Sequence, residues 1–222
     1  MRWRKRFCRA RDPGGSRLYR LSEPPHIRFM AIRKIARMGH PVLRGIAEPV
    51  EDPRDPEIQR LIQDMIETMI DADGAGLAAP QVYVPLRLVI FQAPPSRATG
   101  QLSEEESFDH TAPLTVLMNP IIEVLDETRS KGFEGCLSVP GLRGLVTRAD
   151  HIRYHGIDQN GEPIERVARG FHARVVQHEV DHLCGTLYPQ RMDDITELLF
   201  DSEVKHWLKQ AAETAAEEAE EE

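Results

Sequence analysis

The chain of 222 residues is 41% hydrophobic and 29% charged, an ordinary composition for one globular domain with tails. No apolar run approaches the roughly 20 residues of a membrane-spanning helix, so we expect no contact with a membrane. The net charge is −8, although residues 1–29 carry nine basic and only two acidic residues. The remaining body is therefore strongly acidic, which argues against nucleic-acid binding through a broad basic face.

Residues 1–29 are predicted to be a disordered basic extension, because they show no apolar periodicity and contain Pro-Gly-Gly and Pro-Pro. Three interpretations stay open: upstream sequence that the cell does not translate, a transit peptide, or a basic interaction arm. We favour the first, since the amphipathic pattern of targeting signals is absent and Met30 begins a typical N-terminus. The expected location is a bacterial-type cytoplasm, or an organelle if the extension is a transit segment.

An amphipathic helix is predicted between Asp55 and Ala72. Asp55 can cap its start, Pro56 suits the first helical position, and Gly74 can end it. The apolar residues of this segment recur at the spacing of one helical face. They are Ile58, Leu61, Ile62, Met65, Ile66, Met69 and Ile70.

Strand-like runs of β-branched and apolar residues follow this helix. They cover residues 86–91, 115–125, 146–158 and 163–167. Asn119-Pro120 interrupts the second run, and Asn160-Gly161 between the last two is a strong hairpin signal. Residues 94–113 are polar, with proline, serine, glutamate and glycine, and are predicted to be a mobile surface insertion.

Two further helices are predicted near the C-terminus. One covers residues 171–184 and is closed by Gly185, and the other begins near Asp193-Asp194. Residues 211–222 are rich in alanine and glutamate and are predicted to be an acidic, frayed tail. Strands of antiparallel type combined with a central helix indicate the α+β class.

The helix predicted over residues 171–184 carries an H-E-x-x-H pattern at His178, Glu179 and His182. At 3.6 residues per turn, the two histidines project from one face of the helix, about one turn apart. Two imidazoles so placed can bind one divalent metal, and a neighbouring glutamate can handle the proton of a metal-activated water. The pattern is typical of a metallohydrolase, and a third ligand is still required.

The three cysteines are too few, and odd in number, for a disulfide framework, which indicates a reducing compartment. Cys8 belongs to the N-terminal extension. Cys184 points roughly 200° around the helix from His182, so it is expected to be a small buried residue outside the site. Cys136 is the candidate third ligand, because Gly135 beside it permits close approach of the backbone.

Two other interpretations of the metal site stay open. An endopeptidase that cuts internal peptide bonds would take its third ligand downstream, and Asp194 or Glu197 could supply it. A catalytically silent binding protein is the second, although it would not need Glu179.

The stretch Gly74–Gln81 is built from small residues. Its G-x-G-x-x-A spacing is similar to a dinucleotide-binding fingerprint, but that fingerprint follows a strand and opens a helix. Here the stretch follows a helix and precedes a strand, so we reject a dinucleotide. A loop of small residues can instead pass close to a ligand and present one polar side chain, Gln81.

Taken together and in this order, Gly74–Gln81, Glu134–Pro140 and Gln177–Gly185 resemble the three signature motifs of the peptide deformylases. The resemblance implies a catalytic domain over residues 30–210. It also implies an α+β fold in which antiparallel strands surround a central metal-binding helix, with an N-terminal amphipathic helix and a C-terminal helix.

The resemblance also implies a role for each matching residue. Cys136, His178 and His182 would ligate the metal, and Glu179 would be the catalytic acid and base. Gln81 and the backbone N–H of Leu137 would stabilise the oxyanion of the tetrahedral intermediate.

The substrate-binding residues are expected around that centre. Gly76 and Gly135 would line the substrate backbone, and Arg143 would lie near the mouth of the cleft. Phe171 and Arg174 lie two turns and one turn before His178 on the same helical face. We expect Arg174 to fold over the mouth with its charge in water.

The implied reaction is hydrolysis of the N-formyl group from the formyl-methionine of newly made polypeptides, which releases formate. The implied metal is Fe(2+), with Zn(2+), Ni(2+) or Co(2+) as substitutes, because one thiolate and two imidazoles suit all four. The implied partners are N-formyl-methionyl nascent peptides, with transient proximity to the ribosome. The acidic tail gives no support for direct ribosome contact through residues 211–222.

Overall fold

The computed structural model describes residues 31–98 and 104–221. The predicted basic extension over residues 1–29, with Cys8, lies outside the described residues. The described chain combines helices with two antiparallel sheets, so the predicted α+β class is confirmed. None of the described helices has both the length and the apolar composition that crossing a bilayer requires.

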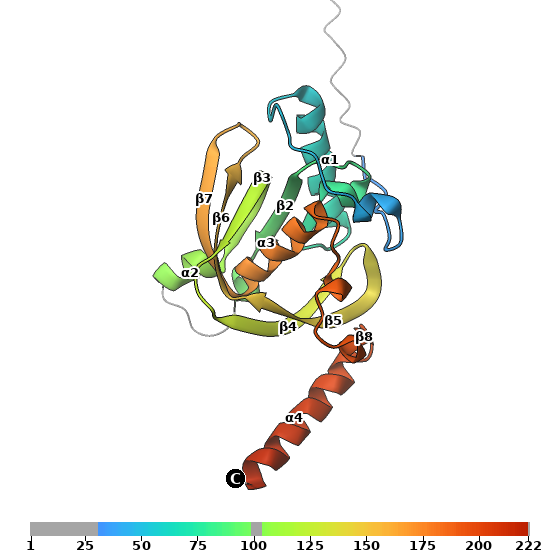
Figure 1. Ribbon diagram of the computed structural model, residues 1–222, viewed down its shortest axis with the longest axis vertical. Helices are drawn as coiled ribbons and strands as arrows, with labels where there is room; N and C mark the ends of the chain where they lie inside the picture. The colour runs from blue at the N-terminus through green and yellow to red at the C-terminus, as the bar shows by residue number, and fades with distance from the viewer. Residues whose placement is uncertain (1–30, 99–103, 222) are drawn as a thin grey trace, which may run out of the picture.

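Two sheets flank helix α3 (Gly170–Leu183). The larger sheet has the strand order β1-β2-β3-β6-β7 and the smaller one β4-β5-β8, with antiparallel pairing throughout. The strands are β1 (Gly76–Ala78), β2 (Leu88–Ala93), β3 (Ala112–Val124), β4 (Arg129–Cys136), β5 (Val139–Ala149), β6 (His151–Ile157), β7 (Pro163–Arg169) and β8 (Leu198–Phe200). Helix α3 contacts strands of both sheets and lies at the centre of the molecule (Figure 1).

Helix α1 (Pro56–Asp71) forms as its caps and periodicity predict. The Asp55 side chain accepts a hydrogen bond from the Glu57 N–H at 2.7 Å, and Pro56 occupies the first turn. The buried face of α1 packs in one apolar cluster with strands β1 and β2. That cluster includes Leu61, Ile62, Met65, Met69, Leu77, Leu88 and Ile90.

The opposite side of the core lies between α3 and the larger sheet. Ala173, Val176 and Leu183 of α3 pack there with Phe91 and Tyr154 of the strands. Because each α3 residue of this face is buried, the helix is held on the sheet by apolar contact. The opposite face of α3 points away from this apolar cluster.

The run predicted as one strand over residues 146–158 is two strands in different sheets, which corrects the sequence analysis. Strand β5 ends at Ala149 and β6 begins at His151. The chain changes sheet at Asp150, whose N–H donates to the Thr128 carbonyl and whose carbonyl accepts from the Gly170 N–H. A continuous β-type pattern carries no sign of such a change, because both strands keep the same alternation. The hairpin of β6 and β7 around Asn160-Gly161 is confirmed, with Gly161 at φ +79°.

Residues 94–113 are not one continuous surface loop. They include a short 3-10 helix (Pro95–Arg97), helix α2 (Glu104–His110) and the start of β3. The carbonyl of Asp109 lies 2.7 Å from the Nδ1 atom of His172, which links the end of α2 to α3.

The C-terminal prediction is wrong about where the last helix begins. Asp194 caps only a 3-10 turn, Ile195–Glu197, and the apolar residues after it form the edge strand β8 on β5. Helix α4 runs from Val204 to Glu221 and projects away from the two sheets (Figure 1). It therefore covers nearly all of the segment predicted as a frayed tail.

Candidate metal centre

Helix α3 positions the two histidines of the H-E-x-x-H pattern side by side. His178 and His182 are both buried, and their ring centroids lie 5.1 Å apart. They project from the face of α3 that is not used by the apolar contact with the larger sheet. The helical spacing alone therefore predicted their meeting correctly.

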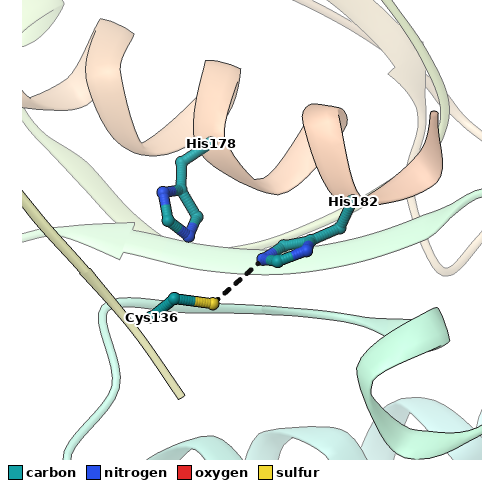
Figure 2. Close-up of side chains that lie close together, drawn as sticks. All are labelled: Cys136, His178 and His182. Atoms are coloured by element: carbon teal, nitrogen blue, oxygen red, sulfur yellow. Dashed lines mark hydrogen bonds between the residues drawn. The ribbon is translucent and has the colours of Figure 1, made fainter. Parts of the chain in front are cut away.

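Cys136 joins them from the other sheet. It is the last residue of β4, at the hairpin where the chain turns into β5. Its Sγ atom lies 3.3 Å from Nε2 of His182, and the ligand atoms of all three residues lie within 4.8 Å of one another. Figure 2 shows one ring nitrogen of each histidine turned toward the sulfur.

The downstream alternatives for a third ligand lie elsewhere. Glu197 is ion-paired with Lys131 at 2.6 Å, and Asp194 accepts hydrogen bonds from Thr196. Within residues 31–98 and 104–221, only Cys136, His178 and His182 form a group of three or more metal-ligating side chains.

The donor set fits one divalent cation. The Nδ1 atom of His178 is 2.8 Å from Oε2 of Glu134, which leaves Nε2 of this ring for the centre. A histidine that ligates a metal usually binds a carboxylate or carbonyl through its other nitrogen, because this sets the tautomer and the ring orientation. One thiolate and two imidazoles are ligands for zinc, iron(II), nickel or cobalt.

Glu134 is the centre of a buried ionic network that the sequence analysis did not identify. Its carboxylate accepts two hydrogen bonds from Arg148, both at 2.9 Å, and one from Arg174 at 3.0 Å. Burial alone would raise the pKa of Glu134, but the hydrogen bonds from Arg148 and His178 lower it to about 2. Arg148 also pairs with Asp181 of α3 at 2.6 Å. The network therefore ties β4, β5 and α3 together beneath the two histidines.

Glu179 lies beside the centre and is 3% exposed. Its Oε2 atom has no hydrogen-bond partner among the described residues. Burial raises the pKa of Glu179 to about 7, with the nearby His178 acting in the opposite direction. A carboxyl group with a pKa near neutrality is suited to accept a proton and return it.

Gln81 presents its amide N–H groups to the same place. Its Oε1 atom accepts a hydrogen bond from the Ala78 N–H at 2.8 Å, so its Nε2 atom faces the other way. Nε2 lies 3.1 Å from Oγ of Ser138 and 3.5 Å from Sγ of Cys136. Leu137 lies between these last two residues, in the turn that joins β4 to β5.

A cavity of about 440 Å³ opens over these residues. The predicted catalytic and substrate-binding residues all contribute to its lining, together with two of the three predicted ligands. They are Gly76, Gln81, Gly135, Cys136, Leu137, Arg143, Phe171, Arg174, His178 and Glu179. Phe133 and Val175, two apolar residues that were not predicted as part of the site, line the same cavity.

Two predictions about single residues are wrong. Arg174 does not fold over the mouth with its charge in water; it is buried, and its guanidinium binds Glu134. The buried Glu134 carboxylate and the carbonyls of Ser130 and Val146 provide acceptors for the guanidinium, and a buried charge is tolerated when it is paired and hydrogen-bonded in this way. Cys184 is exposed rather than buried, because it caps the C-terminal end of α3. Arg143 does lie at an exposed edge of the cavity, where it pairs with Asp201.

A family model, curated proteins and solved structures that are similar to this chain all belong to one family. A model of the polypeptide deformylase family matches residues 32–197. Peptide deformylase 1 of Bordetella pertussis is 54% identical over 166 residues, which cover 74% of this chain and 90% of that protein. A crystal structure of an Acinetobacter baumannii peptide deformylase bound to Met-Ala-Ser matches with a TM-score of 0.62 and 34% identity, over 74% of this chain and 100% of that one. A peptide deformylase from Ehrlichia chaffeensis matches with a TM-score of 0.67 and 30% identity, over 82% of this chain and 97% of that one.

Proposed function

The chain belongs to the peptide deformylase family, metal-dependent enzymes that remove the N-formyl group from nascent polypeptides, and we propose that Cys136, His178 and His182 hold its metal. The observation that carries this assignment is the meeting of one sulfur and two imidazoles within 4.8 Å, beside the buried Glu179. The ligands come from two distant segments of the chain, since Cys136 ends β4 and both histidines lie on α3, with a separation of 46 residues between Cys136 and His182.

We propose Fe(2+) as the metal in the cell, with Zn(2+), Ni(2+) or Co(2+) as substitutes. The donor set accepts all four, so the ligands by themselves give no selection. When bound, such a cation acts as a Lewis acid that makes a water molecule nucleophilic near neutral pH.

Each residue around the proposed metal then has a separate role in the reaction. Glu179 accepts a proton from the attacking water and passes it to the leaving nitrogen as the formyl C–N bond breaks. The Nε2 donor of Gln81 and the backbone N–H of Leu137 stabilise the negative charge that develops on the formyl oxygen. The products are formate and a peptide with a free N-terminal methionine.

The substrate peptide is proposed to bind as an added strand between the two sheets. Gly76 belongs to β1, an edge strand of the larger sheet, and Gly135 belongs to β4, an edge strand of the smaller sheet. Both glycines line the cavity, and unpaired edges of this kind can bind an extended peptide through its backbone. The Met-Ala-Ser complex of the Acinetobacter baumannii relative supports a peptide that begins with methionine.

The boundaries, location and partners of the enzyme remain part of the proposal. We assign catalysis to residues 30–210, with residues 1–29 as a dispensable extension and residues 211–222 as an acidic tail. Nascent formyl-methionyl chains are present where translation begins with formyl-methionine, so we propose a bacterial-type cytoplasm and transient proximity to the ribosome.

The test is formate release by the full-length protein, loaded with iron(II) without oxygen, from formyl-Met-Ala-Ser. We expect formate and free Met-Ala-Ser as the only products, with no cleavage of an internal bond. Mass spectrometry of the peptide products distinguishes the two reactions. Internal cleavage without formate would instead support the endopeptidase interpretation.

We predict that Gly76→Ala lowers kcat by about 100-fold, because displacing a catalytic group by about 1 Å can cost that much. A Cβ atom at this position would lie 2.3 Å from Oε1 of Glu179, so the carboxylate has to move. Gly45→Ala is the matched control: Gly45 has φ −82°, and its nearest neighbour to an added Cβ is 4.0 Å away. Steady-state kinetics of the two variants should differ strongly, and equal kcat values would show that the position of Glu179 is not critical.

A further inference from the structure

The part of the cavity lined by apolar side chains is the place where a substrate's first side chain would bind, if the proposed function is correct. Phe133, Phe171 and Val175 give it apolar walls next to His178. Arg174 lines the same cavity, although a pocket for methionine needs no cation. The position of Arg174 therefore calls for its own explanation.

The guanidinium of Arg174 is held in a fixed position. Its Nη1 atom donates to Oε1 of Glu134 at 3.0 Å and to the Val146 carbonyl at 2.8 Å. Its Nη2 atom donates to the Ser130 carbonyl at 2.8 Å. A side chain bound by a carboxylate and backbone carbonyls cannot swing out of the cavity wall without breaking several buried hydrogen bonds.

The absence of a side chain at Gly132 leaves room for this guanidinium. A Cβ atom there would lie 3.1 Å from Nη2 and 3.2 Å from Cζ of Arg174, closer than most real Cβ contacts. A larger residue at position 132 would therefore press on the guanidinium. Gly132 and Arg174 are best understood as a pair, in which the missing side chain of one makes room for the other.

One donor of Arg174, the Nε–H group, has no acceptor in the part of the chain that the structure describes. Among the described residues, all hydrogen bonds of this side chain involve Nη1 and Nη2, and none involves Nε. About 10% of the side chain stays exposed, and the residue borders the cavity. Because the terminal nitrogens are occupied by protein acceptors, the Nε–H is the group left to meet a ligand.

We propose that the Nε–H of Arg174 is a specificity determinant that binds an acceptor atom at the δ position of the substrate's first side chain. Methionine has a weak acceptor there, its thioether sulfur. Methionine sulfoxide has a strong acceptor oxygen on the same sulfur. Norleucine has the same length and no acceptor. The enzyme therefore deformylates peptides that begin with oxidised formyl-methionine, which a purely apolar pocket would reject.

The experiment compares kcat/KM of the metal-loaded enzyme for formyl-Met-Ala-Ser and for its methionine-sulfoxide and norleucine analogues. For the wild type we expect kcat/KM of the sulfoxide peptide to be within about tenfold of the value for the methionine peptide. The kcat/KM of the norleucine peptide should be lower than that of the methionine peptide, because a pocket with a polar group discriminates against a ligand that leaves it unpaired. In Arg174→Met, kcat/KM of the sulfoxide peptide should fall by about 100-fold relative to that of the methionine peptide. The preference for methionine over norleucine should vanish.

Two further variants isolate the cause. Arg174→Lys keeps a cationic donor and should restore part of the sulfoxide activity. Arg153→Met removes an arginine outside the cavity, which forms an exposed pair with Glu123 on the larger sheet, and it should leave the ratio of sulfoxide to methionine unchanged.

The outcomes are distinct from those that test the proposed function. No formate from any peptide would contradict the proposed function itself. Normal activity on formyl-Met-Ala-Ser, with a sulfoxide ratio that is equal in the wild type and in Arg174→Met, would overturn the role of Arg174. If Arg174→Met does not fold, the wild type decides alone, since rejection of the sulfoxide by more than about 100-fold contradicts a free donor in the pocket.

Discussion

Glu179→Ala is expected to lower kcat for formate release by about 10³- to 10⁴-fold, the upper part of the range that general acid–base catalysis contributes. The reason is that Glu179 is the only buried carboxyl group in the cavity lining, among the described residues, that is not paired with an arginine. Of the other carboxyl groups in the lining, those of Glu134 and Asp201 are paired with Arg148 and Arg143, and that of Asp73 is exposed to solvent. No other described side chain can therefore take over the proton transfer.

The same variant should keep its metal, which separates a catalytic role from a ligand role. We expect about one equivalent of iron or zinc in Glu179→Ala, measured by elemental analysis after gel filtration. Cys136→Ala should lose most of the metal together with the activity, because one of three ligands is gone. Glu197→Ala, a change at the rival ligand, should keep both metal and activity. Metal retained in Cys136→Ala and lost in Glu197→Ala would reverse the assignment of the third ligand.

Glu134→Ala is expected to destabilise the fold by about 3–5 kcal/mol, the usual cost of removing one partner of a buried ion pair. The change leaves the Arg148 guanidinium without two hydrogen bonds and removes one acceptor from Arg174. It also removes the partner of Nδ1 of His178, so we expect weaker metal binding as well. Since a domain of this size is stable by only about 5–15 kcal/mol, part of the population should unfold well below the melting temperature of the wild type.

Denaturation in urea, followed by circular dichroism, measures this loss. Glu123→Ala is the matched control, because Glu123 forms an exposed ion pair with Arg153 at 3.1 Å. An exposed pair of this kind contributes about 0–1 kcal/mol, so the control should unfold almost as the wild type does. Similar denaturation midpoints for the two variants would show that the buried network around Glu134 does not stabilise the fold.

The helices at the site could be predicted from the sequence because their signals are local. For α1, the capping residue Asp55, Pro56 and one apolar stripe are all within a single segment of the chain. For α3, the spacing of His178 and His182 determines that they share a face, whatever the helix packs against. The order of the three motifs, read with the resemblance to a known family, led to Cys136 as the third ligand.

The strands were less predictable. Strand β4 (Arg129–Cys136) is mostly polar and contains two glycines, and β8 (Leu198–Phe200) has three residues, so neither shows a clear alternation. Each becomes a strand by pairing with β5. The division at Asp150 and the true start of the last helix were missed for the same reason, because pairing between distant segments leaves no local pattern.

The amino-acid sequence by itself determined the two main helices, the face of α3 that carries the imidazoles, and the chemistry that a cysteine and a glutamate near them can perform. Only the tertiary structure decided where the charges go. It turned Arg174 inward to Glu134, aligned Nδ1 of His178 with the same carboxylate, and left the Nε–H of Arg174 without an acceptor in the described part of the chain. The physical reason is that a charged or polar group binds whichever partner the fold brings within about 3 Å. Which partner that is depends on sheet pairing between residues far apart in the chain.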